Sequence, residues 1–176
     1  MNFLNFDKNL LINLEKSLAK EMIRTNRAGA YCSSTLVDCN TRKYHGQLVV
    51  PLPHIDNHNH VLLSSIDETI CKHGAEFNLS VHQYPNNHIF PNGHKYIREF
   101  DCNSISKTVF RVGSVIIAKE RCMVFYENKV LIKYTMLETQ SATTLRLKPL
   151  LAFRSVHELC KENSLINNSY TEIANG

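Results

Sequence analysis

The stretch 106–138, SKTVFRVGSVIIAKERCMVFYENKVLIKYTMLE, decides the fold class of this chain. Apolar and β-branched residues fill three runs, and the short segments RVGS and YENK separate them. Segments that contain Gly or Asn between such runs are typical of turns that connect neighbouring strands. The stretch therefore predicts three consecutive strands, at Ser106–Val112, Ser114–Phe125 and Lys129–Glu138.

The same pattern continues through most of the chain after Thr25. In TTLRLKPL, at 143–150, leucines fall on one face of the expected strand and Arg146 and Lys148 fall on the other. A sharp turn is predicted at 91–93, because Pro presets φ and Gly supplies a positive φ. Ten strands without helices between them predict an all-β fold, an antiparallel sandwich. The other seven strands are expected at Ser34–Asp38, Gly46–Leu52, His60–Ile66, Glu68–Lys72, Ala75–Tyr84, Lys95–Asp101 and Thr143–Phe153.

The two ends of the chain differ from this pattern. Residues 1–22 are expected to hold a short N-terminal helix that covers a sheet edge, because leucines recur at helical spacing after Asp7, a suitable N-cap. Residues 25–176 then form the sandwich, so that 1–176 is one domain. The last stretch, 163–176, ends without a closing feature, and a sandwich interrupted there would expose a strand edge. We therefore expect the chain to be the front part of a longer protein.

Composition excludes several classes of protein. Of the 176 residues, 43% are hydrophobic and 20% are charged, as in folded globular domains. The net charge of +4 is small and scattered, which argues against a nucleic-acid partner. No apolar run approaches the roughly 18 residues of a membrane span, so no membrane partner is expected. The N-terminus has no cleavable signal, and six cysteines without a C-x-x-C pair suggest free thiols, so we expect a cytoplasmic protein.

Motifs for cofactors and metals are weak. The chain has no G-x-S-x-G elbow, no G-x-x-x-x-G-K loop and no G-x-G-x-x-G loop, so we predict no cofactor. HIDNHNH, at 54–60, contains three histidines and Asp56, and His58 and His60 would share a face of an extended strand. Imidazoles at that spacing suit zinc or nickel, and chelator-sensitive melting would favour a metal-binding protein. Prolines flank the segment and no partner ligands are evident, so a solvated loop is the preferred interpretation and no metal site is predicted.

Paired carboxylates are a further possibility for chemistry. Asp67 and Glu68 are adjacent, and adjacent residues point to opposite faces of a strand. They therefore cannot by themselves form the pair that a glycosidase holds across a sugar. We favour the interpretation that Asp67 and Glu68 are turn residues whose carboxylates accept hydrogen bonds from backbone amides. We predict no catalytic residue in this chain.

Two polar clusters remain. NTRKYHG places Arg42, Tyr44 and His45 in front of a strand, and AFRSVHEL places Arg154 and His157 after another. Arginine and tyrosine bind and stack on sugars, and they also anchor protein interfaces. The residues alone leave two interpretations open, a surface recognition site and a structural cap at the strand ends.

Residues 21–163 resemble the N-terminal domain of bacterial and archaeal glycogen debranching enzymes. The resemblance rests on TN…GAY, NTRKYHG, DET, YP…PNG and P…AFR…H, which occur in the order and spacing of that family. Two departures concern local loop shape. Met22 stands where the family commonly has Trp, and RAGA replaces a glycine-richer turn.

The resemblance implies a β-supersandwich, similar to those that precede the (α/α)6 barrels of bacterial glucoamylases. It implies that such a barrel follows in the full-length chain and removes α-1,6-linked glucose from glycogen or another branched α-glucan. The general acid and general base of that reaction would belong to the barrel. The implied partners are thus the C-terminal (α/α)6 barrel and the glucan, and this chain alone is expected to be inactive.

The resemblance also implies a role for the polar clusters. Arg42, Tyr44 and His45 would face the barrel near its substrate entrance, and Gly46 would allow close backbone approach. The other residues that could belong to this face are Asp67, Glu68, Arg154 and His157. A buried corner without glucan contact remains the alternative for the site.

A stand-alone glucan-binding module remains the alternative for the chain. Such a module needs exposed aromatic rings as platforms for sugars. The chain has no Trp, so Tyr84, Tyr96 and Tyr126 would have to serve.

Overall fold

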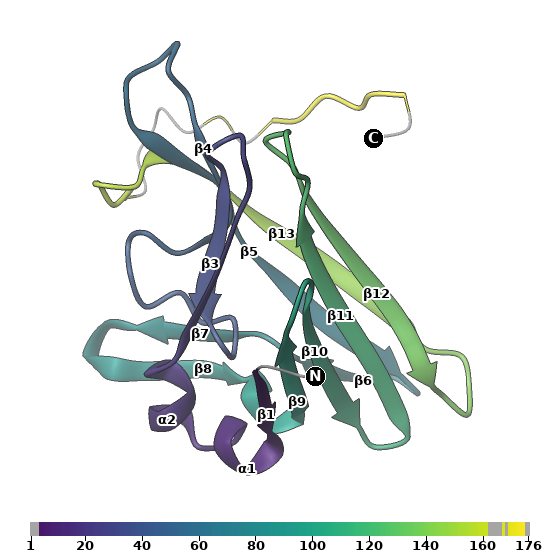
Figure 1. Ribbon diagram of the computed structural model, residues 1–176. Helices are drawn as coiled ribbons and strands as arrows, with labels where there is room; N and C mark the ends of the chain where they lie inside the picture. The colour runs from purple at the N-terminus through teal and green to yellow at the C-terminus, as the bar shows by residue number, and fades with distance from the viewer. Residues whose placement is uncertain (1–3, 162–166, 168, 175–176) are drawn as a thin grey trace.

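A computed structural model describes residues 4–161, 167 and 169–174, and within them thirteen strands form two antiparallel sheets and a hairpin (Figure 1). The first sheet contains, in spatial order, β1 (Asn5–Asp7), β9 (Ile97–Cys102), β10 (Ser106–Val112), β11 (Val115–Met123) and β12 (Val130–Glu138). The second contains β13 (Thr144–Ser155), β5 (Asn59–Lys72), β4 (Gly46–Pro51), β3 (Tyr31–Thr35) and β2 (Glu21–Thr25), with β6 (Ala75–Asn78) also paired to β5. The hairpin is β7 (Val81–Tyr84) and β8 (His88–Asn92). The prediction of an all-β antiparallel sandwich is confirmed.

The core lies between the two sheets. Alternate residues of β10 and β11 point inward, among them Phe110 and Ile117, and they meet Ile70 from the second sheet and Phe100 from β9. Each fully buried side chain of this size contributes roughly 1.5–3 kcal/mol through removal of apolar area from water. The inward face of β11 continues with Lys119 and Arg121, so charged groups occupy the end of the same row.

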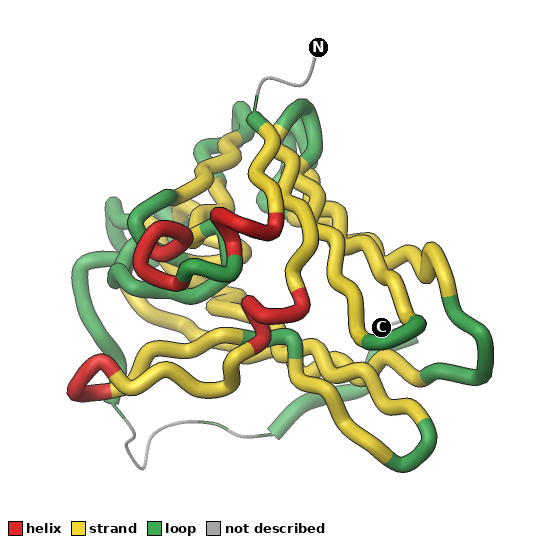
Figure 2. The backbone as a smooth tube through the Cα atoms, turned by 90° about the horizontal axis from the view of Figure 1, so that it is seen from below, coloured by secondary structure: helices red, strands yellow, loops and turns green. Residues whose placement is uncertain are grey.

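The N-terminal segment forms two helices instead of one. Asp7 caps α1 (Lys8–Leu11) as predicted, because its side chain accepts the Leu10 N–H at 3.1 Å. Asn13 then accepts the Lys16 N–H at 3.0 Å and begins α2 (Leu14–Leu18). A side chain that bonds the backbone in this way interrupts a continuous helix, which the leucine spacing does not reveal. The helices are short segments in a backbone made mostly of strands (Figure 2).

Strands appear at both borders of the predicted helix. Met22 lies in β2, and β1 pairs with the outer edge of β9, so a strand closes the edge that the helix was expected to cover. The predicted strands His60–Ile66 and Glu68–Lys72 are one strand, β5, whereas the predicted strand Ala75–Tyr84 is divided into β6 and β7. The predicted strand Ser34–Asp38 is displaced, since β3 ends at Thr35 and residues 36–38 form a turn. The other predicted strands are present within two residues of their expected bounds.

The predicted turn at 91–93 is wrong. Pro91 and Asn92 end β8, and Gly93 begins a 3-10 helix, η2 (Gly93–Tyr96), without a positive φ. Gly93 is needed for another reason: a Cβ on it would lie 1.9 Å from the carbonyl oxygen of Leu79. The glycine thus allows close approach of two backbones at this point.

The edge strands of the two sheets, β12 and β13, carry exposed apolar side chains. Those on β12 are Leu131, Met136 and Leu137, and those on β13 are Leu147, Leu151 and Phe153. The C-terminal end of β13 reaches the loop between β3 and β4, which holds the first polar cluster predicted from the sequence. The fold therefore brings the two polar clusters to one corner of the sandwich.

Candidate functional site

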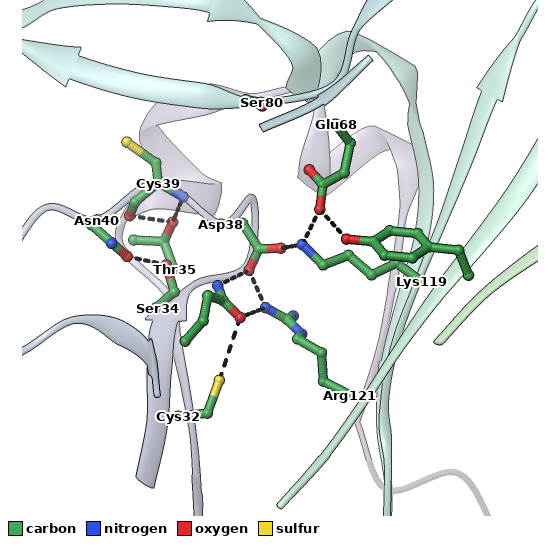
Figure 3. Close-up of polar contacts among 12 residues, drawn as sticks. Cys32, Ser34, Thr35, Asp38, Cys39, Asn40, Glu68, Ser80, Lys119 and Arg121 are labelled. Atoms are coloured by element: carbon green, nitrogen blue, oxygen red, sulfur yellow. Dashed lines mark hydrogen bonds and ion pairs between the residues drawn. The ribbon is translucent and has the colours of Figure 1, made fainter. Parts of the chain in front are cut away.

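The loop between β3 and β4 is held by its own side chains. The Thr35 hydroxyl accepts the Cys39 N–H at 3.0 Å and donates to the Cys39 carbonyl at 2.9 Å. The Asn40 amide oxygen accepts the Ser34 hydroxyl at 2.8 Å (Figure 3). The amide nitrogen of Asn40 donates to the Ser64 carbonyl on β5 at 2.9 Å. The first half of the loop is thereby fixed to two neighbouring strands before the polar residues begin.

His45 supports the second half of the loop from inside. It is buried, and its Nδ1 accepts the Thr41 N–H at 3.1 Å. Burial lowers the pKa of His45, against the opposing effect of Glu21, so the neutral ring carries its proton on Nε2. Nε2 lies 3.5 Å from Glu21 Oε1 without hydrogen-bond geometry. Of the predicted site residues, His45 therefore positions the loop and does not face solvent.

Arg42 lies on the outside of the same loop. Its Nε is 2.6 Å from Glu21 Oε1, and its side chain is 67% exposed. An exposed ion pair of this kind contributes little to stability, about 0–1 kcal/mol. Most of the guanidinium is thus available to another surface.

Arg154 joins the two polar clusters. One amino group, Nη2, donates to the Lys43 carbonyl at 2.8 Å, and the other, Nη1, donates to the Glu158 carbonyl at 2.9 Å. In the reverse direction, the Lys43 ammonium donates to the His157 carbonyl at 3.1 Å. These reciprocal bonds connect segments that are far apart in sequence, and they use Arg154 for support of the backbone.

The rings of Tyr44, His58 and His157 gather on the outside of this corner. Tyr44 and His157 meet edge to face at 5.7 Å, with the Tyr44 hydroxyl 3.3 Å from His157 Nδ1, and His58 meets His157 at 4.9 Å. All three are exposed, Tyr44 by 43%. We call Arg42, Lys43, Tyr44, His58 and His157 the corner surface. Its combination of rings and hydrogen-bonding groups suits a sugar or a protein interface.

Gly46 begins β4 directly behind the corner surface. A Cβ there would lie 2.9 Å from methyl groups of both Val49 and Val61. The close contacts at Gly46 are therefore made by side chains of the second sheet, and the approach of a partner at Gly46 stays a prediction. The glycine permits the tight packing of Val49, Val61 and Val156 below the corner.

Asp67 and Glu68 do not join the corner surface. Asp67 lies 2.7 Å from His82 Nε2 on β7, whereas Glu68 points into the sandwich. The expectation that they share a face with Arg154 and His157 is wrong, because Arg154 lies opposite Val61 near one end of β5, whereas Asp67 and Glu68 lie opposite Lys148 and Leu147, farther along the strand. Neither acid bonds backbone amides of a turn as expected from the sequence.

Glu68 belongs instead to a group that we call the interior charge cluster, which consists of Asp38, Glu68, Lys119 and Arg121 (Figure 3). The Lys119 ammonium lies 2.5 Å from Glu68 Oε1 and 3.0 Å from Asp38 Oδ2. The Arg121 Nη1 group donates to Asp38 Oδ1 and also to Gln47 Oε1 at 3.1 Å. The Tyr134 hydroxyl donates to Glu68 Oε1 at 2.7 Å. Side chains from both sheets thus form one hydrogen-bonded unit.

The charges of this cluster stabilise one another. Burial alone would raise the pKa of Asp38, but Arg121 and Lys119 outweigh it and lower the pKa to about 2. Burial opposes the charge of Lys119, yet Asp38 and Glu68 raise its pKa above the ordinary value. Asp38 and Lys119 therefore stay ionised near neutral pH. Such a unit holds the sheets in register, and none of its acids is free to act as a general acid or base.

The sequence contained one signal for this cluster. Lys119 and Arg121 alternate with residues of the opposite face in β11 and follow the inward residues Val115 and Ile117. Period-two spacing places all four on the inner face. Their partners Asp38 and Glu68 come from remote segments, so the pairing itself requires the tertiary structure.

Two of the three histidines at 54–60, His58 and His60, make ring contacts. His58 meets His157, and the ring of His60 stacks on Phe153 at 5.6 Å. His60 Nε2 lies 3.6 Å from Asp56 Oδ2. Over the part of the chain that the structure describes, no group of three or more His, Cys, Asp or Glu residues is arranged to hold a metal ion.

Comparison with known proteins gives one result for this chain. A family model described as glycogen debranching enzyme N terminal matches residues 20–176. The comparisons with curated proteins and with solved structures gave no match. None of the helices within the described residues has the length and apolar character needed to cross a membrane. Because the family model covers most of its length, the chain belongs to the glycogen debranching enzyme N-terminal family.

Proposed function

We propose that this chain is the non-catalytic N-terminal domain of a glycogen debranching enzyme with amylo-α-1,6-glucosidase activity. In this proposal the corner surface packs on a C-terminal (α/α)6 barrel and helps to shape the entrance for a branched α-glucan. The family match supports the first statement. The second is supported by one observation: Arg154 and His45 fix a corner that leaves Arg42, Tyr44 and His157 exposed.

The rigidity of the corner matters for this role. A surface that is already ordered loses little conformational entropy when it binds a sugar or a neighbouring domain. The rings of Tyr44 and His157 offer apolar faces, and Arg42 offers donors that match hydroxyl oxygens. The domain would thus contribute orientation of the glucan, while the barrel contributes the two acids of hydrolysis.

The experiment uses the full-length enzyme that contains this chain. Tyr44→Ala and Arg42→Ala are compared with Tyr126→Ala, which removes an exposed ring outside the corner surface. We expect the two corner variants to lower kcat/KM for glucose release from a branched glucan by about ten-fold, the equivalent of one lost contact of 1.4 kcal/mol. Unchanged kcat/KM together with unchanged stability of both corner variants would contradict the assignment of this surface.

The gene offers an earlier test of the same proposal. Reading the sequence beyond the codon of Gly176 shows whether a helical-repeat region with spaced acidic residues follows in frame. A stop codon at that point would remove the barrel from the proposal. The glucan-binding alternative would then become the leading interpretation.

One observation favours a stand-alone glucan-binding module as the second candidate. Phe125 and Tyr126 meet edge to face at 4.7 Å and are both exposed, with the Arg27 guanidinium 4.8 Å from the Phe125 ring. Tyr84 is also exposed, whereas Tyr96 packs on Phe77 against the core and is not a platform. Titration of the chain with malto-oligosaccharides tests this candidate, since Tyr126→Ala would abolish binding and Tyr44→Ala would not.

A further inference from the structure

A small polar cavity of about 230 Å³ lies between β2 and β11, beside the interior charge cluster. Two arginines from different sheets line it, Arg24 on β2 and Arg121 on β11. Two like charges brought together inside a protein repel each other and lose hydration. Their presence around one cavity therefore calls for a compensating group.

Of the three nitrogens of the Arg121 guanidinium, one makes hydrogen bonds to the described residues. Its side chain is 2% exposed, and Nη1 makes the bonds to Asp38 and Gln47. The Nε and Nη2 atoms, which form the other edge of the guanidinium, are buried and have no hydrogen-bond partner among the described residues. Two parallel N–H groups on such an edge are the geometry that binds carboxylate or phosphate oxygens in pairs.

Further unpartnered groups lie close by. Arg24 donates from Nη2 to the Asn103 carbonyl, but its buried Nε has no partner. Ser106 is directly opposite Arg121 in the β10–β11 ladder, and its buried hydroxyl is also without a partner. A buried donor left unsatisfied is costly, so native proteins rarely tolerate several at one place. These donors together need an acceptor, which the part of the chain that the structure describes does not supply.

The balance of charge leads to the same conclusion. The interior charge cluster contains two acids and two bases, so it is neutral by itself, and Arg24 adds one positive charge. Within the described residues, no carboxylate lies within ion-pair distance of Arg24 or of the free edge of Arg121. The nearby Cys32 thiol does not compensate, since burial raises its pKa and keeps it neutral. Water in the cavity would satisfy the hydrogen bonds, whereas an anion would also offset this charge.

We propose that this cavity is a binding site for a small oxyanion of the phosphate class. Two of its oxygens accept from Nε and Nη2 of Arg121, and a third accepts from Nε of Arg24. The anion would join β2 to β11 and so lock the two sheets together at an end where the protein leaves its own donors unpaired.

Thermal unfolding of the 176-residue chain in inorganic phosphate and in chloride at equal ionic strength tests this proposal. A ligand that binds only the folded chain raises the Tm in a saturable way. We expect phosphate to raise the Tm with saturation and chloride to leave it nearly unchanged. Acetate serves as a third arm that distinguishes a carboxylate from a phosphate as the preferred oxyanion. Equal shifts in all three salts would overturn the proposal and indicate a general salt effect on a water-filled cavity.

Arg24→Gln is the decisive variant, since it removes one donor and the uncompensated charge without touching the interior charge cluster. Its affinity for phosphate, measured by titration calorimetry, should fall about ten-fold or more, as expected for a lost hydrogen bond to a charged group. The control is Arg111→Gln, an exposed arginine of β10 that bonds the Gly113 carbonyl, and it should keep wild-type affinity. Unaltered affinity in Arg24→Gln would refute the site. Broadening of the free phosphate signal in ³¹P NMR by the wild-type chain, but not by Arg24→Gln, gives a second readout independent of folding stability.

Discussion

The Lys119 ammonium and the Glu68 carboxylate lie 2.5 Å apart in the interior of the sandwich, with side chains only 1% and 4% exposed. Lys119 comes from β11 in the first sheet and Glu68 from β5 in the second. A pair of charges therefore joins the two sheets where apolar packing would be the usual solution. Each charge is tolerated in this position only because the other is present.

Removal of one member of the Lys119–Glu68 pair should lower the free energy of unfolding more than the loss of the pair as a whole would suggest. We expect Lys119→Met to lower the free energy of unfolding by about 3–5 kcal/mol, since it leaves the buried Glu68 carboxyl without its ammonium partner. The double variant Glu68→Gln/Lys119→Met should lose less than the sum of the two single variants. Urea unfolding of all four proteins measures the coupling. Strict additivity would show that the two groups do not stabilise each other.

The lowered pKa of Asp38 predicts how the stability of the folded chain changes in acid. Its pKa is about 2 in the folded chain, below the ordinary value of 3.8, so the folded chain binds fewer protons than the unfolded chain between these values. The stabilisation is therefore complete above pH 4 and is lost as the pH falls toward 2, with a size of about 2 kcal/mol.

Asp38→Asn is the variant that checks this behaviour. It should be less stable than wild type at pH 7 and should show a weaker loss of stability between pH 4 and pH 2. Urea midpoints across that pH range measure both effects. Parallel pH profiles for wild type and variant would assign the acid sensitivity to other carboxyls.

Tyr134 should contribute through its hydroxyl. The hydroxyl donates to Glu68 Oε1 at 2.7 Å, and burial, followed by the charge of Glu68, raises the pKa of Tyr134 so that it stays protonated. Tyr134→Phe should therefore cost about 1.5–3 kcal/mol, the value of a hydrogen bond to a charged group. Tyr126→Phe is the matched control on an exposed ring and should be neutral in the same thermal unfolding assay.

Gly93 tests the close backbone approach between η2 and Leu79, the residue that follows β6. Gly93→Ala would place a Cβ 1.9 Å from the Leu79 carbonyl oxygen, so we expect a loss of about 3 kcal/mol or more, at the upper end of overpacking costs. Gly74→Asn is the control, because Gly74 has φ +78 and open space around it. Asn tolerates that conformation, so the control should melt close to wild type. A similar Tm for the two variants would contradict the steric explanation.

Strand positions could be predicted where local pattern and turn chemistry agree. β10 occupies 106–112 as predicted, because alternation defines the strand and RVGS ends it. The N-terminal segment could not be predicted in the same way. Leucines at helical spacing gave no indication that the Asn13 side chain would interrupt the helix, or that β1 would find a pairing edge on β9. Such outcomes depend on partners that are remote in sequence.

The candidate site, too, could be predicted from the sequence only in part. Tyr44 and His157 come together as expected, because β4 and β13 flank β5 and their polar ends meet at one corner. The role of Glu68 could not be predicted, since its partners Lys119 and Tyr134 belong to the other sheet. The residues next to an acid in the sequence do not show whether it lies beside a turn or inside the sandwich. Only the tertiary structure distinguishes them.

The pairing of β13 with β5 has a consequence for synthesis on the ribosome. β13 pairs with β5 from Thr144 opposite Cys71 to Ser155 opposite His60, so the whole segment 73–143 must be made before the second sheet can be completed. Throughout that interval a long edge of β5 has no neighbour, and unpaired edges invite association with other chains. Chaperone dependence of this domain should therefore be greatest for nascent chains that end before residue 144.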